Sequence, residues 1–289
     1  MDVIAIQTGT VAVKSRQRVG VGSGRRRFLK TLIDREWSEP LPILAWIITH
    51  PDGVIVVDTG ETSRVAERGY FPAWHPYFRL GLREWVKPEE EMGRQLSAHG
   101  IAAKDVSVVV LTHLHTDHAG GLHAFPDTKM LVSRREMQLA AGLMGRMRGY
   151  LNDEFPDWFS PTPVDFDDEP FGPFPSSKRV TDDGDVRLVP TPGHTPGHLS
   201  VVVEADDCTY LLAGDASYSE ELMLAGVVDG VAADDAEARL TLDRIRALAA
   251  ERRVVYLPSH DPGSVERLLT QRPVMTVTRS ELTHDPAMI

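Results

Sequence analysis

One apolar run followed directly by a group of histidines constrains this sequence more than any other feature. Residues 106–111, Val-Ser-Val-Val-Val-Leu, have the length and composition of a buried strand, and Thr-His-Leu-His-Thr-Asp-His follows them. His113 and His115 are two positions apart and face the same side of an extended backbone, while Asp117 and His118 can turn back from the next element. Imidazoles at a strand end gain little without a partner, so the pattern predicts a metal site.

A metal site needs further ligands, and three residues elsewhere in the chain stand in suitable positions. His194 lies in the tight loop PGHTPGH, Asp215 ends the apolar run TYLLAGD, and His260 ends the run VVYLPSH. Each lies where an expected strand meets a loop. Together with the first cluster they give five histidines and two carboxylates, enough for two metal ions if one carboxylate bridges. Nitrogen mixed with carboxylate oxygen suits zinc first, with iron, manganese or cobalt as alternatives.

The rest of the pattern is that of an α/β chain. The runs that end at Asp58 and Asp215 both place an apolar strand before an acidic residue, which suggests two similar halves. Two β-rich halves packed as a sheet sandwich with outer helices would bring the strand-end loops to one rim, where sites commonly form. Strands are predicted at 3–6, 44–49, 54–57, 106–111, 185–190, 198–205, 208–213 and 253–257, and helices at about 88–99, 133–147 and 234–250.

Helix ends are suggested by capping residues. Ser133 and Glu136 have the spacing of a capping box, and Asp234 is expected to cap the last predicted helix. The basic run at 25–27 is expected to lie in a solvated or dimer-contact loop. Cys208, the one cysteine, is expected to be a buried structural thiol.

Composition limits the partners. The 289 residues allow one large domain or two small ones, and no apolar run approaches the roughly 20 residues that span a bilayer. The N-terminus lacks the order of a secretory signal, so we expect a cytoplasmic protein without membrane contact. A net charge of −11 disfavours nucleic acid as a partner.

Two aromatic-rich stretches, at about 62–87 and 149–178, fit the regular scaffold poorly. Long loops of this kind either serve function or enclose a small satellite core, and both interpretations stay open. Among the remaining polar residues, Asp58 is expected to orient a ligand histidine, because a ligating imidazole normally donates its other N–H to an acceptor. His198 is expected to have no such role. Turn or surface positions are expected for His50, His75, His99, His123 and His284.

The motif HLHTDHAGG, the loop PGHTPGH, the strand-terminal Asp215 and the late His260 together resemble the metallo-β-lactamase superfamily, over about residues 2–270. The resemblance implies an αββα sandwich, one domain over 1–289 with loop insertions at about 62–87 and 149–178, and two divalent transition-metal ions. It places His113, His115 and His194 on one ion, Asp117, His118 and His260 on the other, and Asp215 between them.

Two divalent ions roughly 3.5–4 Å apart lower the pKa of a shared water and stabilise the oxyanion that forms on attack, so hydrolysis is the expected reaction. Asp117 is expected to bind a metal and also to pass a proton to the leaving group. Tyr218 stands three residues after Asp215, a spacing that resembles the quorum-quenching N-acyl-homoserine lactone lactonases. In that family the phenol hydrogen-bonds the substrate carbonyl. The resemblance therefore implies that a hydroxide bridging the ions opens an acyl lactone, with Asp117 and Tyr218 as catalytic residues. It also implies a homodimer formed through the N-terminal loop.

The same superfamily supplies the alternatives. A thioesterase resembling the hydroxyacylglutathione hydrolases would share all seven ligands but needs basic residues near the C-terminus, where Arg267, Arg272 and Arg279 are scattered. Another ester or organophosphate hydrolase also stays open. The net charge disfavours an RNA-processing phosphodiesterase, and the carboxylate of Asp215 disfavours a β-lactamase. Non-hydrolytic alternatives are a diiron redox domain, which usually has glutamate in place of His115, and a metal-holding scaffold.

Overall fold

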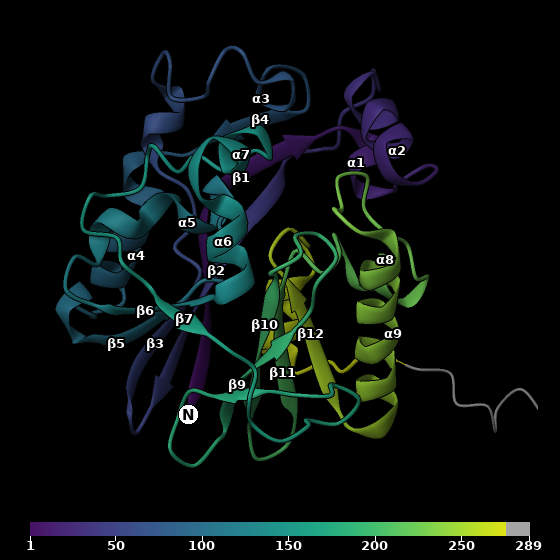
Figure 1. Cartoon of the computed structure of the whole chain (residues 1–289). Coiled ribbons are helices and arrows are strands. Elements are labelled where there is room, and N and C mark those ends of the chain that lie inside the picture. The colour runs from purple at the N-terminus through teal and green to yellow at the C-terminus, as the bar shows by residue number, and fades with distance from the viewer. Residues whose placement is uncertain (276–289) are drawn as a thin grey trace, which may run out of the picture.

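The computed structural model describes residues 1–275 and arranges them in four layers, with two stacked sheets between outer helices (Figure 1). One sheet has seven strands in the order β4-β1-β2-β3-β5-β6-β7, and the other has five in the order β12-β11-β10-β9-β8. The predicted αββα sandwich is therefore confirmed. The predicted domain limits, 1–289, extend beyond the described residues and stay a prediction.

The first sheet is built from β1 (Asp2–Val13), β2 (Leu41–His50), β3 (Gly53–Val57), β4 (Leu82–Trp85), β5 (Val106–Val110), β6 (Lys129–Ser133) and β7 (Thr162–Val164). The second is built from β8 (Lys178–Arg179), β9 (Val186–Pro190), β10 (Leu199–Glu204), β11 (Thr209–Gly214) and β12 (Val254–Pro258). The helices are α1 (Ser15–Arg18), α2 (Gly24–Leu32), α3 (Pro76–Leu80), α4 (Met92–Ala98), α5 (Thr116–Ala119), α6 (Arg134–Ala140), α7 (Gly142–Met147), α8 (Glu220–Leu224), α9 (Asp235–Glu251) and α10 (Ser264–Thr270). No helix within residues 1–275 combines the length and the apolar character needed to cross a bilayer.

Parallel strand pairs in both sheets position the candidate site. β3 and β5 run parallel, so the residues that follow them, Asp58 and those from Thr112 onward, reach the same edge of the first sheet. β11 and β12 also run parallel and deliver Asp215 and His260 to one edge of the second sheet. These two edges meet at one rim of the sandwich, as predicted, because His118 Nε2 of the first half lies 3.2 Å from Asp215 Oδ1 of the second.

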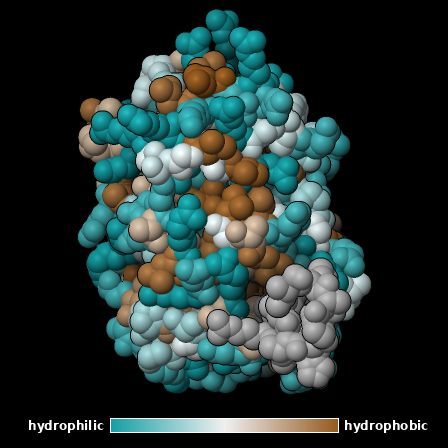
Figure 2. Space-filling model, turned by 90° about the vertical axis from the view of Figure 1, so that its right-hand side faces the viewer, coloured by the Kyte–Doolittle hydropathy of each residue, from teal (hydrophilic) through white to brown (hydrophobic). Residues whose placement is uncertain are grey.

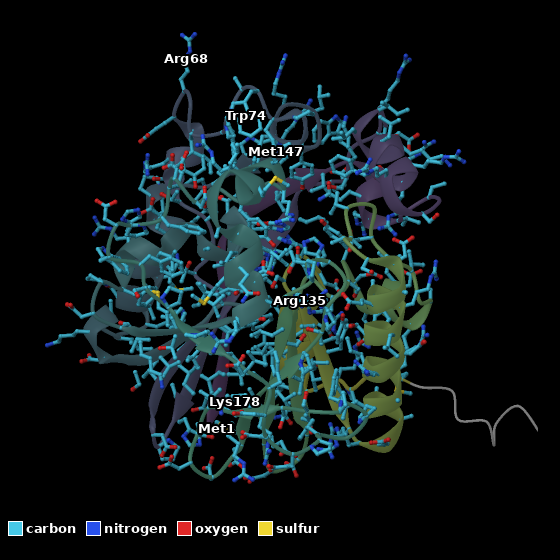
Figure 3. The ribbon with its side chains drawn as sticks, in the orientation of Figure 1. Met1, Arg68, Trp74, Arg135, Met147 and Lys178 are labelled. Atoms are coloured by element: carbon cyan, nitrogen blue, oxygen red, sulfur yellow. The ribbon has the colours of Figure 1, made fainter. Side chains whose placement is uncertain are left out.

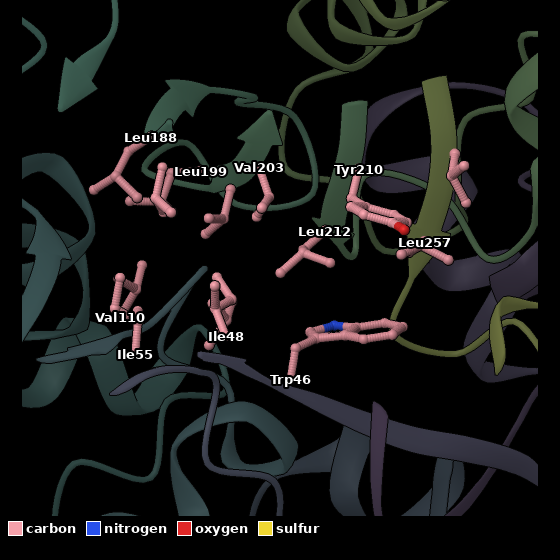
Figure 4. Close-up of a cluster of buried hydrophobic side chains, with 14 of the residues drawn as sticks. Trp46, Ile48, Ile55, Val110, Leu188, Leu199, Val203, Tyr210, Leu212 and Leu257 are labelled. Atoms are coloured by element: carbon pink, nitrogen blue, oxygen red, sulfur yellow. The ribbon is translucent and has the colours of Figure 1, made fainter. Parts of the chain in front are cut away.

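The core between the sheets explains why β2 is apolar from Leu41 to Ile48. Its alternate residues Trp46 and Ile48 face the second sheet, where Leu212 and Leu257 lie opposite them (Figure 4). The intervening side chains of β2 pack under α4, so both faces of the strand are buried. Full burial of side chains of this size stabilises the fold by about 1.5–3 kcal/mol each. Cys208 belongs to the same core, which confirms its prediction as a buried thiol.

The predicted helix at 133–147 is wrong as a single element, and so is its capping box. Ala141 has extended backbone angles and separates α6 from α7. The Ser133 side chain caps nothing. Glu136 is buried and hydrogen-bonds to residues from three other segments, so tertiary contacts override the local capping pattern. The predicted cap at Asp234 is confirmed, because its carboxylate accepts from two backbone N–H groups at the start of α9.

Three further expectations need correction. The predicted helix at 88–99 is a short 3-10 turn followed by α4, interrupted at Glu91, whose carboxylate binds Ser63. The insertions predicted as loops contain α3, β4 and β7, because their chain pairs with sheet edges. The basic run at 25–27 lies on α2 instead of in a loop.

Arg27 is the buried member of that basic run, and its guanidinium lies 2.5 Å from Asp235 and donates to the carbonyl of Ala232. On the face of the molecule that carries α2, α8 and α9, apolar side chains gather in patches among hydrophilic ones (Figure 2). Phe28 and Leu29 of α2 are among the exposed apolar side chains. The predicted homodimer stays a prediction.

Candidate metal centre

All seven predicted metal ligands converge at the rim where the two sheets meet. They come from five segments, so strand ends and short loops fix their positions. His113 and His115 follow β5, while Asp117 and His118 lie on α5; His194 lies between β9 and β10, Asp215 follows β11, and His260 follows β12.

The first group contains three imidazoles that point at a common centre. His115 Nδ1 lies 3.0 Å from His113 Nε2 and 3.1 Å from His194 Nε2. A ring N–H could join each of these pairs by a hydrogen bond, whereas a cation at the common centre would use the lone pairs of all three nitrogens at once. Burial and the neighbouring His194 lower the pKa of His115 to about 3, so this imidazole is neutral at physiological pH and has a lone pair to offer.

The second group combines one carboxylate with two imidazoles. His260 Nε2 lies 3.2 Å from Asp117 Oδ2, and His118 Nε2 lies 3.9 Å from Asp117 Oδ1. Burial opposes the ionised form of Asp117, but the two histidines lower the pKa of its carboxyl to about 2. The carboxylate is therefore charged over the whole physiological range.

Asp215 lies between the two groups. Its Oδ1 is 3.2 Å from His118 Nε2 and 3.3 Å from His260 Nε2, whereas its Oδ2 is 3.4 Å from His194 Nε2. One carboxylate oxygen thus faces each group, which is the arrangement that a bridging ligand requires.

Unpartnered atoms at this point provide a test of whether cations fit. Asp215 Oδ1 and His118 Nε2 are both buried and lie 3.2 Å apart, but their mutual geometry is not that of a hydrogen bond and neither has another hydrogen-bond partner within residues 1–275. An unsatisfied buried polar group costs about 1–3 kcal/mol, so such groups call for a ligand. Nitrogen and carboxylate donors aimed at the same space fit a two-metal site of the kind that binds zinc or similar ions.

Several of the candidate ligand histidines have a hydrogen-bond partner at Nδ1, the ring nitrogen that faces away from the centre, and one of these contacts was predicted. Asp58 Oδ2 lies 2.8 Å from His118 Nδ1, so the expected contact of Asp58 with a clustered histidine is confirmed. Asp229 Oδ2 lies 3.3 Å from His194 Nδ1, and the carbonyl of Pro42 lies 2.9 Å from His260 Nδ1. No motif identifies Asp229 or a backbone carbonyl as partners. All three contacts leave Nε2 directed at the centre.

Among the described residues His198 orients no ligand histidine, as predicted, but it does contact the backbone of the candidate ligand Asp215. His198 is buried, its Nε2 accepts from the backbone N–H of Asp215 at 3.0 Å, and its Nδ1 lies 2.8 Å from the Thr191 hydroxyl. Burial, followed by the charge of His194, lowers its pKa to about 3, so the imidazole stays neutral and can accept. Gly214 is required beside it, since φ is +52° there and an added Cβ would lie 2.6 Å from His198 Nε2.

Glu136 is a supporting residue that the sequence pattern misassigned. Its carboxylate accepts from the backbone N–H of Leu114 at 3.1 Å, from Tyr150 Oη at 2.8 Å and from Thr195 Oγ1 at 2.7 Å. Leu114 lies between two candidate ligands, and Thr195 follows a third. A single buried side chain therefore ties together the loops that carry His113, His115 and His194.

A cavity of about 310 Å³ opens beside the two groups. Tyr218 lies in its wall, with its ring stacked on that of His260 at a centroid distance of 5.7 Å. The first aromatic stretch forms part of the cavity wall and also a small satellite core, and Phe78 belongs to both. Tyr77 and Phe78 line the cavity, while Tyr70 packs in a satellite cluster with Phe78 and Leu151.

The outer end of the cavity is apolar. Met147 lines it and is 58% exposed, and Trp74, 53% exposed, lies on the same side of the molecule (Figure 3). His75 connects these segments, because its Nε2 lies 3.2 Å from the Met147 carbonyl. Its backbone N–H closes a turn by donating to the Pro72 carbonyl, which agrees with the predicted turn or surface position, but its side chain is buried in the cavity wall. His99 and His123 are exposed as predicted, His50 lies at the end of β2 beside the hairpin turn, and His284 lies outside the described residues.

Comparison with known proteins agrees with this geometry. The family model for the metallo-beta-lactamase superfamily matches residues 38–260. The N-acyl homoserine lactonase AttM of Azorhizobium caulinodans is 30% identical over 236 residues, which are 78% of this chain and 83% of that protein. A probable metallo-hydrolase of Mycobacterium tuberculosis is 34% identical over 190 residues, 64% of this chain and 58% of that protein. A solved N-acyl homoserine lactone hydrolase, with N-hexanoyl-L-homoserine at its catalytic metal centre, superposes with a TM-score of 0.75 at 22% identity, covering 92% of this chain and 96% of that one.

The chain belongs to the metallo-β-lactamase superfamily. Within that superfamily it is a metal-dependent hydrolase related to the N-acyl homoserine lactonases.

Proposed function

We propose that this protein opens the lactone ring of N-acyl-homoserine lactones with the help of two divalent metal ions, zinc in the first instance. The proposed ligands are the seven residues gathered at the rim. His113, His115 and His194 would hold one ion, Asp117, His118 and His260 the other, and Asp215 would bridge them.

Two ions bound there would supply an activated water and a positive charge for the oxyanion. The protein's own side chains account for proton transfer and orientation. Asp117 is ionised, lines the cavity and lies beside His260. Its carboxylate can therefore take the proton that the attacking water loses and pass it to the leaving alkoxide.

The position of Tyr218 is the observation that carries the lactonase proposal. Its ring lines the cavity and stacks on that of His260, one of the candidate metal ligands. Burial is the largest cause that raises the pKa of the Tyr218 phenol well above its usual range, followed by the electrostatic effects of the neighbouring Tyr77 and Asp215. The neutral phenol can donate a hydrogen bond to a carbonyl oxygen held beside the metals.

The cavity wall favours an uncharged acyl compound. Val11, Val13, Phe78 and Leu82 contribute apolar side chains to the cavity that the candidate metal ligands and Met147 also line. An acyl chain that leaves the ring in this direction would remain against apolar surface until it reaches solvent.

A glutathione thioester is a poorer fit. Arg267 is buried, with its guanidinium 2.7 Å from Asp261, and Arg272 lies 3.1 Å from Glu220. Both arginines are thus engaged within the protein and do not offer a free cationic site. Arg279 lies outside the described residues.

The first prediction is that metal-loaded protein hydrolyses N-acyl-homoserine lactones and releases one proton per turnover, which pH titration can follow. Acidifying the product should slowly regenerate the lactone, whereas cleavage of the amide would not allow this. Chain-length series from butanoyl to dodecanoyl should show kcat/KM rising with length, because each buried methylene contributes at most about 0.8 kcal/mol.

S-lactoylglutathione and a phosphodiester serve as comparison substrates in the same assay. Rapid thioester hydrolysis without opening of any acyl-homoserine lactone would reject the proposal and favour the thioesterase. Failure on all three substrate classes would favour a metal-holding scaffold.

The second prediction concerns Tyr218→Phe. This variant should retain its metal content and lose about 1–4 kcal/mol of transition-state stabilisation, the range for one hydrogen bond to a developing oxyanion. Steady-state kinetics on the metal-replete variant, beside metal analysis, measures this. Undiminished kcat/KM would remove Tyr218 from the mechanism.

A further inference from the structure

Gln17, on the short helix α1, lies between two tyrosines of the cavity wall. Its side chain is buried, with the residue 2% exposed. Its Nε2 lies 2.8 Å from the hydroxyl oxygen of Tyr218 and 2.8 Å from that of Tyr77. A carboxamide nitrogen carries two hydrogens and accepts none, so Gln17 donates to both phenol oxygens.

This polarity determines where the phenolic hydrogens point. An oxygen that accepts from Gln17 must direct its own hydrogen elsewhere, and no acceptor for either hydrogen is found among residues 1–275. Both tyrosines line the cavity. Burial, as the largest cause, raises the pKa of both phenols, so both keep their hydrogens at neutral pH. The cavity therefore contains two adjacent free donors.

We propose that Gln17 is a positioning residue that directs the hydroxyl hydrogens of Tyr218 and Tyr77 toward two carbonyl oxygens of the substrate. The inference rests on the proposed function, because an N-acyl lactone has two such oxygens separated by a short linkage. Tyr218, stacked on His260, takes the ring carbonyl, and Tyr77 takes the amide carbonyl.

The backbone fixes the position of Gln17. Gln17 itself is anchored, since its backbone carbonyl accepts from the N–H of Gly230 at 2.7 Å. It can therefore hold its side chain without help from the substrate.

The test uses Gln17→Met, which keeps the length of the side chain and removes its hydrogen bonds. We expect kcat to fall roughly 10- to 100-fold, because the Tyr218 donor remains but is no longer aligned. Metal content should stay unchanged, and KM should rise only through the lost alignment of Tyr77. Gln138→Met, on the exposed face of α6, is the matched control and should behave as wild type.

A double-mutant cycle separates positioning from a structural role. If Gln17 acts through Tyr218, Gln17→Met should lower kcat by less than about 3-fold in a Tyr218→Phe background. Multiplicative losses, or an unchanged kcat in the single variant, would overturn the inference. Tyr77→Phe should lower the preference for N-acyl-homoserine lactones over γ-alkyl lactones, which have no amide, by about 10-fold, the value of roughly one hydrogen bond. An unchanged preference would overturn the assignment of Tyr77.

The two proposals fail in different ways. If the wild-type protein prefers a thioester or another ester as substrate, this result rejects the lactonase proposal without any data from the variants. The Gln17 cycle is then run on that substrate, because its carbonyl oxygen needs the same donor from Tyr218. Normal lactone opening combined with full kcat in Gln17→Met would leave the proposed function intact and reject the role of Gln17.

Discussion

Asp215→Asn is expected to lower turnover by at least about 100-fold, beyond the roughly 10- to 100-fold range for loss of an outer-sphere partner of a metal site. Asp215 Oδ1 and Oδ2 face different groups of candidate ligands, and no other carboxylate of the seven is placed to do so. An amide in its place offers one neutral oxygen and an NH₂ group that cannot bind a cation. Metal analysis of the reloaded variant should give fewer than the about two equivalents expected for wild type.

Asp207→Asn is the matched control for this substitution, since Asp207 is an exposed residue just before β11. It should retain both activity and metal. If Asp215→Asn instead binds two equivalents and turns over at the wild-type rate, the bridging role is wrong. A wild-type protein that reproducibly binds only one equivalent would contradict the two-ion proposal itself.

The candidate ligands were predictable because the relevant chemistry is local. Histidines and aspartates at strand ends are recognisable in a short window, as in the segment from His113 to His118 that follows β5. The sandwich was predictable for a related reason, because runs such as β2 and β11 are apolar along their whole length and must be covered on both faces.

Apart from Asp58, the partners of the site residues were not predictable, because distant segments supply them. Gln17 and Tyr218 are 201 positions apart, and His260 and Pro42 are 218 positions apart. A glutamine in a four-residue helix and a carbonyl before a strand look the same whether or not a site lies beside them. Only the pairing of strands brings these groups together.

Local patterns failed where a buried polar group had a stronger tertiary partner. Ser133 and Glu136 match a capping box, yet Glu136 turns inward. The backbone N–H of Leu114 and the hydroxyls of Tyr150 and Thr195 together satisfy its carboxylate better than one exposed helix end could. The contact of His198 was not predictable for the same reason, because its acceptor role depends on the backbone N–H of Asp215.

Glu136→Leu is expected to destabilise the fold by about 3–5 kcal/mol. The leucine fills a similar volume but leaves three buried donors without an acceptor, and each such group costs about 1–3 kcal/mol. For a domain of this size the loss corresponds to a fall in Tm of roughly 10 °C. Glu136→Gln should be milder, since the carboxamide oxygen can still accept from Leu114 and Tyr150, and its nitrogen can donate to the Thr195 hydroxyl.

Thermal unfolding of the metal-free proteins measures this effect without the contribution of bound ions to stability. Glu251→Leu, an exposed change at the end of α9, is the control and should alter stability by no more than about 0.5 kcal/mol. Because Glu136 holds the loops of His113, His115 and His194, its loss should also weaken metal binding at temperatures where the variant is fully folded. Wild-type stability and wild-type metal affinity in Glu136→Leu would show that the strand ends alone hold these loops in place.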